Sequence, residues 1–155
     1  MTSYYEQTKA DCLVSTDPAL LDIGMIHDWL SKESYWSANI PLDTLKRALE
    51  NTLCFGIYIN HRQIGFARVV TDKATFAYLA DVFILPGYRG KGYAKKLMEV
   101  IHAHPDLQGL RRWVLITRDA HSLYESFGWT RLDENVADRF MQKHDKEVYD
   151  PLRAD

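Results

Sequence analysis

The stretch LPGYRGKGYAKKL, residues 85–97, concentrates groups that can bind an anion. Three glycines, Arg89 and Lys91 fall within residues 87–92, directly after an apolar run and directly before a helical pattern. A loop that enters a helix points unpaired backbone N–H groups toward one place, where the helix dipole adds partial positive charge. Glycines let such a backbone close around a ligand. The loop therefore predicts an anion site, most often one for phosphate.

Two nucleotide-binding motifs fail at this loop. A P-loop requires GxxxxGK followed by Ser or Thr, but Gly87 and Gly90 are too close together and Gly92 stands where the hydroxyl belongs. The dinucleotide motif GxGxxG fails because Lys95 occupies its third glycine position. A plain left-handed turn after a strand is the alternative that needs no ligand. Three glycines with two cations at a helix start favour the anion site over that turn.

The elements around the loop follow from hydrophobic periodicity. The order β-α-α-β-β-β-α-β-α-β predicts an α/β or α+β fold, with a mixed sheet and helices on both of its faces. Asp17 and Asp119 are expected to cap the first and the last of the helices. We expect helices over 18–31, 42–49, 93–104 and 119–127, strands over 11–16, 53–59, 63–70, 75–85 and 111–117, and further strands beyond, with RFMQKH among them.

Composition narrows the class of protein. The chain has 155 residues, enough for one domain over 1–155. Its net charge of −2 provides no basic field for nucleic acid or an anionic membrane, and no apolar run approaches the ~20 residues of a membrane span. Cys12 and Cys54 make no disulfide framework, and the first residues do not have the pattern of a signal peptide. These features predict a cytoplasmic domain, and we expect no metal.

The loop also carries a family pattern. Arg89, Gly92 and Ala94 fit Q/R-x-x-G-x-G/A, preceded by an apolar strand and followed by a helix. Here the chain resembles the GNAT superfamily of acyl-CoA-dependent N-acetyltransferases, whose pyrophosphate-binding loop has this pattern. The resemblance implies a GNAT-like, mixed and mostly antiparallel sheet, in which the fourth and fifth strands splay apart.

A second family pattern lies downstream, N-x-x-A-x-x-x-Y-x-x-x-G-F. Ala120, Tyr124 and Gly128 stand at its spacings, while Thr117 replaces the Asn and Trp129 replaces the Phe. The Thr puts one family hydrogen bond to the cofactor in doubt. The two patterns together extend the resemblance over roughly residues 53–129.

The resemblance implies acetyl-CoA as the cosubstrate. Its pantetheine arm would pair with the backbone of Val82, Phe83 and Ile84, and a backbone N–H of the same strand would polarise the thioester carbonyl. The pyrophosphate would lie on the backbone N–H groups of Arg89, Gly90, Lys91, Gly92, Tyr93 and Ala94.

Two side chains are candidates for moving protons. Tyr124 occupies the family's general-acid position, where a phenol can give a proton to a leaving thiolate; the alternative is a Tyr that only packs against the sheet. Asp81 is the one charged residue in the strand 75–85 and could act as the base, directly or through water. The alternatives are a structural Asp bonded to a cation such as Arg68, a base role for His27 or His121, or a chain of waters alone.

The acceptor site is expected in the connector between the first two helices, where this family usually builds it. Tyr35 and Trp36 there have apolar bodies with polar tips, which suit ligand contact, although they could equally fill the core. We predict transfer to a primary amine, most simply that of a small molecule. The alternative acceptor is a protein N-terminus or lysine, and the alternative function is that of a non-catalytic acyl-CoA-binding domain. The sequence is compatible with a homodimer.

Overall fold

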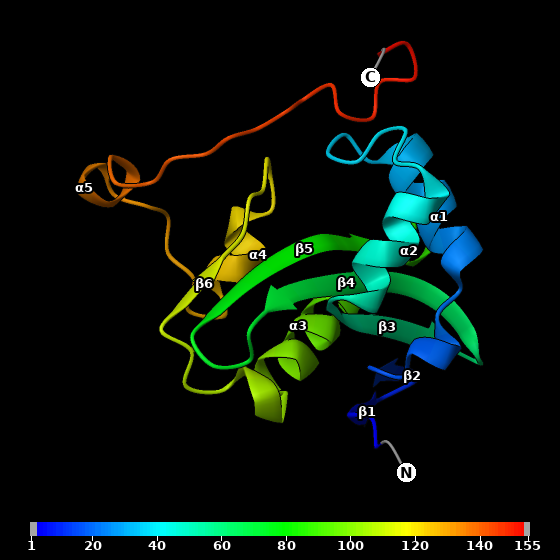
Figure 1. Ribbon diagram of the computed structural model, residues 1–155. Coiled ribbons are helices and arrows are strands. Elements are labelled where there is room, and N and C mark those ends of the chain that lie inside the picture. The colour runs from blue at the N-terminus through cyan, green and yellow to red at the C-terminus, as the bar shows by residue number, and fades with distance from the viewer. Residues whose placement is uncertain (1–2, 154–155) are drawn as a thin grey trace.

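The computed structural model describes residues 3–153 and contains one six-stranded sheet. The strands lie side by side in chain order, antiparallel except for the parallel pair β5 and β6 (Figure 1). They are β1 (Glu6–Lys9), β2 (Cys12–Ser15), β3 (Leu53–Ile59), β4 (Arg62–Thr71), β5 (Phe76–Ile84) and β6 (Arg112–Val114). The helices are α1 (Ile23–Glu33), α2 (Leu42–Glu50), α3 (Tyr93–Ala103), α4 (His121–Glu125) and α5 (Glu134–Ala137), with 3-10 turns η1 (Pro18–Leu20), η2 (Pro86–Tyr88) and η3 (Pro105–Leu107).

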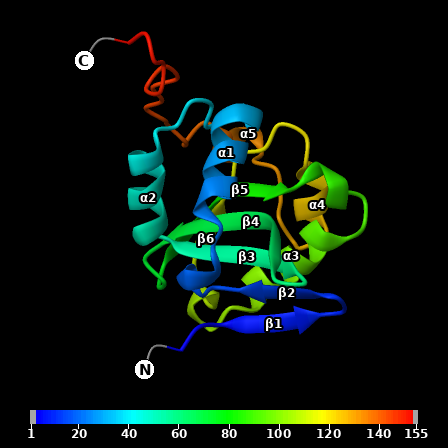
Figure 2. The same ribbon diagram turned by 90° about the vertical axis from the view of Figure 1, so that its right-hand side faces the viewer.

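Helices cover both faces of the sheet (Figures 1 and 2). On one face α1 and α2 bury Ile26 and Leu45 in a cluster that includes Phe66 of β4. On the other face α3 buries Leu97 and Ile101 in the larger cluster. Two apolar layers with the sheet between them confirm the predicted mixed α/β fold. None of the described helices is long and apolar enough to cross a membrane.

The hairpin predicted around residues 60–62 is confirmed. Strands β3 and β4 pair in antiparallel register, and Asn60 and His61 both have positive φ, 49° and 67°. Positive φ at both central residues is the signature of the type I′ turn, whose twist matches that of the flanking strands.

The N-terminal part differs from the prediction in two places. Strand β1 adds to the edge of β2, although its polar sequence EQTK shows no apolar alternation. The helix expected from residue 18 is only the 3-10 turn η1, where Asp17 accepts the Ala19 N–H at 2.9 Å. Helix α1 begins later because Asp22 caps it, accepting the Met25 N–H at 3.0 Å.

The strands expected in the last part of the chain, RFMQKH among them, are wrong. Between Val114 and residue 153 the structure contains no strand and only the short helices α4 and α5. The side chains there find little to pack on, and Met141 is 95% exposed. The segment instead runs from α5 toward the α1–α2 end of the molecule (Figure 1), where Tyr149 packs against the smaller apolar cluster.

One buried hydroxyl offers a test of the core. The Tyr58 side chain lies over Gly56, and its hydroxyl has no hydrogen-bond partner among the described residues. Because a buried donor without a partner costs about 1–3 kcal/mol, Tyr58→Phe is expected to raise the free energy of unfolding by about 1 kcal/mol in a urea titration. Tyr93→Phe is the matched control, since the Tyr93 hydroxyl donates to Asp11 at 2.7 Å and its loss should destabilise. A Tyr58→Phe protein less stable than wild type would contradict the assignment.

Candidate active site

The glycine loop ends β5 and starts α3. Gly90 and Gly92 have φ of 75° and 83°, and Gly92 is the residue that caps α3. The backbone N–H groups of residues 90–95 donate to no acceptor among the described residues. A Cβ built on Gly90 or Gly92 would meet nothing within 4 Å, so the space beside the loop is open. Free donors, open space and a helix N-terminus together fit a phosphate group.

Arg89 holds this loop against the sheet. Its Nε donates to the Ile84 carbonyl at 2.9 Å, and its backbone N–H donates to the Pro86 carbonyl at 3.3 Å. The Arg89 N–H is therefore engaged within the loop, and the free donors begin at Gly90.

The start of α3 is anchored to the N-terminal hairpin. The Tyr93 hydroxyl donates to Asp11, which raises the pKa of Tyr93 to about 12 and lowers the pKa of Asp11. Lys96 lies 3.8 Å from the same carboxylate and over the Tyr93 ring. The Tyr93 side chain thus supports the loop, while its backbone N–H stays free.

Strands β5 and β6 separate after a short contact. They pair only between Phe76–Tyr78 and Arg112–Val114, so β6 gives no partner to residues 79–84 of β5. Strand β1 was not predicted, so the predicted fourth and fifth strands are β5 and β6. Their expected separation is confirmed. The stretch Val82, Phe83 and Ile84 lies along this open half of β5, directly before the loop.

Asp81 lies in a β-bulge of β5. Phe66 faces Phe83 and Arg68 faces Ala80, so Ala67 of β4 lies opposite two residues, one of which is Asp81. Asp81 takes a φ of 56°, a left-handed conformation that Asp tolerates better than most residues. The bulge re-aims the carboxylate, which a regular strand would point elsewhere.

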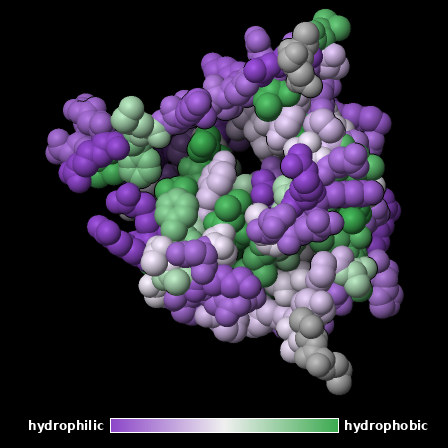
Figure 3. Space-filling model, viewed as in Figure 1, coloured by the Kyte–Doolittle hydropathy of each residue, from purple (hydrophilic) through white to green (hydrophobic). Residues whose placement is uncertain are grey.

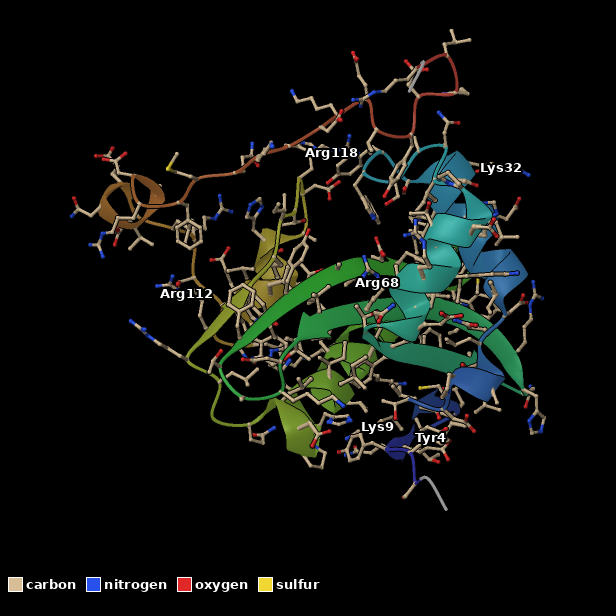
Figure 4. The ribbon with its side chains drawn as sticks, viewed as in Figure 1. Tyr4, Lys9, Lys32, Arg68, Arg112 and Arg118 are labelled. Carbon is tan, nitrogen blue, oxygen red and sulfur yellow. The ribbon has the colours of Figure 1, made fainter. Side chains whose placement is uncertain are left out.

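Both carboxylate oxygens of Asp81 have partners. Arg68 donates through Nε to Oδ2 at 2.8 Å, and Trp36 donates through Nε1 to Oδ1 at 2.8 Å. The side chains of Arg68 and Asp81 are only 17% and 6% exposed, so this ion pair is largely shielded from water. Arg68, labelled in Figure 4, thus shares the carboxylate with Trp36 of the α1–α2 connector. The contact with Arg68 is the structural role foreseen as the alternative for Asp81.

Tyr35 and Trp36 lie in the connector between α1 and α2, next to an aromatic cluster. Trp29 of α1 stacks on Phe83 at 4.2 Å, with 12° between the ring planes. Trp36 lies 5.7 Å from Trp29 and 5.0 Å from Tyr35. Tyr35 is 51% exposed, so the aromatic cluster extends from the buried Phe83 to the surface of the protein.

Tyr124 is buried in the larger apolar cluster, next to Trp129. Burial raises the pKa of Tyr124 to about 12, and the nearby Tyr35 hydroxyl adds to this rise. No hydrogen bond joins the Tyr124 hydroxyl to another described residue. Helix α4 carries Tyr124. The prediction that Asp119 caps this helix is wrong, because the Thr117 hydroxyl accepts the Ala120 N–H at 3.0 Å instead. Thr117 therefore helps to start the helix that positions Tyr124.

A cleft of about 870 Å³ borders Tyr124 on the side of the C-terminal segment. Trp113, His121 and Met141 contribute to its walls, and it is more apolar than polar. In Figure 3 hydrophobic side chains gather in the hollow between the segment that carries α5 and the sheet. Neither the glycine loop nor Asp81 lines this cleft.

The structure adds one residue that the sequence analysis missed. Arg118, at the tip of the loop between β6 and α4, lies over the Tyr35 ring at 4.2 Å from its centre (Figure 4). In the sequence, only the position of Arg118 next to Thr117, within the second family pattern, could have drawn attention to it. Two loops far apart in the sequence thus meet across the open half of β5.

The two histidines considered as bases are placed differently. His27 donates through Nε2 to the Ile40 carbonyl at 2.8 Å, so it ties α1 to the connector. His121 lines the cleft together with Tyr124. Among residues 3–153 no group of His, Cys, Asp or Glu side chains is arranged to hold a metal ion.

Comparison with known proteins identifies the family. Residues 50–131, just over half of the chain, match the model of the acetyltransferase (GNAT) domain. The protein named "Putative acetyltransferase FG08082" of Gibberella zeae is 36% identical, over 76% of this chain and 77% of its own length. The "Uncharacterized N-acetyltransferase ycf52-like" of Prochlorococcus marinus is 37% identical, over 83% of this chain and 68% of its own.

Solved structures of other proteins support the same family. A crystal structure of a protein described as belonging to the GNAT family, from Xanthomonas campestris pv. campestris, is 50% identical, covers 90% of this chain and 96% of its own, and superposes with a TM-score of 0.86. The ribosomal-protein-S18-alanine N-acetyltransferase of Escherichia coli shares the fold at 20% identity, with 79% of each chain covered and a TM-score of 0.64. The chain therefore belongs to the GNAT family of N-acetyltransferases.

Proposed function

We propose that the protein transfers the acetyl group of acetyl-CoA to the primary amine of a small molecule, by direct attack in a ternary complex. The observation that carries this proposal is the row of free N–H groups over residues 90–95, which continues directly from the open half of β5. An anion can bind to the free N–H groups, and an extended chain can pair with the open half of β5. A molecule with both parts, a pyrophosphate and a long amide-bearing arm, fits that arrangement.

The N–H groups from Gly90 to Ala94, with the charge of Lys91 nearby, would hold the pyrophosphate. The backbone of Val82, Phe83 and Ile84 would pair with the pantetheine arm. When bound, acetyl-CoA supplies the acetyl group already activated as a thioester. A protein of similar fold, Rv2747 of Mycobacterium tuberculosis, was solved in complex with CoA, at 16% identity and a TM-score of 0.63.

Tyr124 is the proposed general acid. Its raised pKa, about 12, keeps the hydroxyl protonated throughout the physiological range. The proton sits on an oxygen with no competing acceptor among the described residues, so it is available to a leaving thiolate.

Asp81 is the proposed proton acceptor, directly or through one water. Each carboxylate oxygen has more than one lone pair, so the contacts with Arg68 and Trp36 leave capacity for a further proton donor. The same contacts fix where the carboxylate points. Tyr35 and Trp36 would then flank the acceptor, because they stand between Asp81 and the solvent-exposed loop that carries Arg118.

Thermal unfolding with saturating ligand tests the proposal. Acetyl-CoA at about 100 times its Kd is expected to stabilise the folded protein by about 3 kcal/mol, whereas ADP and ATP should give a much smaller shift. Thiol release with a panel of amines and N-terminal peptides then identifies the acceptor. No shift with acetyl-CoA in a folded sample would contradict the proposal. Binding without thiol release would instead indicate a non-catalytic acyl-CoA-binding domain.

A further inference from the structure

Arg118 has an arrangement that points to a ligand. Its guanidinium lies 4.2 Å from the centre of the Tyr35 ring, and no ion pair joins it to Asp119 or to any other carboxylate in residues 3–153. Stacking uses the flat face of a guanidinium and leaves its N–H donors free at the edge. The contact with the ring therefore favours this position of the side chain and leaves its N–H donors available.

The position of Arg118 connects it to the reacting groups. Tyr35, on which it rests, contacts Trp36 at 5.0 Å, and Trp36 donates to Asp81. Tyr35 is also close enough to Tyr124 to help raise its pKa. Arg118 thus lies at the rim of the region where Asp81 and Tyr124 would meet the acceptor.

The charges of this region favour an anion. Arg68 neutralises Asp81 at 2.8 Å, which leaves little net negative charge to attract a bare ammonium group. The guanidinium of Arg118 remains uncompensated. The unpaired guanidinium would repel an amine that approaches it, whereas it would attract an anionic group of the acceptor.

We propose that Arg118, which lies over the Tyr35 ring, binds an anionic group of the acceptor, so that the substrate is an amine that also carries a carboxylate or a phosphate. This inference rests on the proposed transfer to an amine. The guanidinium fork matches either anion with two parallel hydrogen bonds. The rings of Tyr35 and Trp36 would pack against the apolar part of the same molecule.

Calorimetric binding to the protein saturated with CoA tests this without requiring turnover. Phenylalanine is compared with phenethylamine for the carboxylate, and phosphoethanolamine with ethanolamine for the phosphate. The anionic member of at least one pair is expected to bind about tenfold or more tightly than its partner. Which pair shows the difference identifies the anion.

Variants then assign the effect to Arg118. Arg118→Gln should remove about tenfold of that affinity and change the affinity for the partner without an anionic group by no more than about twofold, while Arg118→Lys should keep part of the gain. Arg62→Gln, on the distant β3–β4 hairpin, removes the same charge and should change nothing. Equal binding within both pairs, binding of none of the compounds, or an equal loss for both members in Arg118→Gln would overturn the inference.

A titration of the protein with CoA alone, together with the thiol-release assay, separates the two hypotheses. If CoA itself fails to bind, the proposed function fails. If CoA binds and thiol release occurs with some amine, but the anionic group gives no advantage, only the role of Arg118 fails.

Discussion

Tyr124→Phe is expected to lower kcat by about 100-fold or more and to leave the affinity for acetyl-CoA nearly unchanged. The substitution removes a single oxygen from a buried side chain whose hydroxyl is bonded to no other described residue. The packing of α4 should therefore survive, and the loss would fall on proton transfer, a contribution of about 10²–10⁴-fold. Steady-state kinetics together with the Kd for acetyl-CoA measure the two quantities separately.

The control for this variant is Tyr58→Phe. It removes the same atom from another buried tyrosine, on β3 and outside the proposed site, and full activity is expected. If Tyr124→Phe turns over like the wild type, Tyr124 has no part in the mechanism.

The pH profile gives a second check on Tyr124. Because burial raises its pKa to about 12, the hydroxyl keeps its proton well above pH 10, where an ordinary tyrosine would be half ionised. The rate should therefore show no loss due to Tyr124 below about pH 11. A decline that begins near pH 9 in the wild type and is absent in Tyr124→Phe would contradict the raised pKa.

Gly92→Val is expected to abolish measurable binding of acetyl-CoA. The Cβ and its methyl groups would project into the open space beside the free N–H groups of residues 90–95, where a phosphate must approach the backbone. The φ of 83° adds strain of about 1–2 kcal/mol for any residue with a Cβ. Calorimetry with acetyl-CoA and thermal unfolding without ligand measure the two effects.

Two further glycines separate strain from obstruction. Gly109→Val introduces the same residue at a φ of 69°, in the connection between η3 and β6 and outside the loop, so it should lose stability and keep binding. Gly87→Val places a Val in the same loop region without a positive φ, so it should keep both stability and most of the affinity. A folded Gly92→Val protein that binds acetyl-CoA as the wild type does would show that the loop is not the cofactor site.

The sequence by itself determined the elements whose formation depends on local chemistry. The glycine loop, helix α3 and the β3–β4 hairpin were predicted because glycine conformation, helical periodicity and turn residues act within a few positions. The same holds for the two motifs, which located the loop and Tyr124 on the elements that carry them. Strand β1 was not predicted, because its polar residues form a strand through pairing with β2 and show no strand pattern of their own.

The tertiary structure decided which side chains meet. The bulge at Asp81 depends on the register between β4 and β5, and the contacts of Asp81 with Arg68 and Trp36 join three separate segments. The Arg118–Tyr35 contact links positions 83 residues apart, through loops that no local pattern relates. The strands expected after β6 are absent from the described residues, because an apolar alternation forms a strand only where a neighbouring edge is available to pair with it. Local propensity thus determined what the chain can form, whereas register and packing determined which reactive groups lie together.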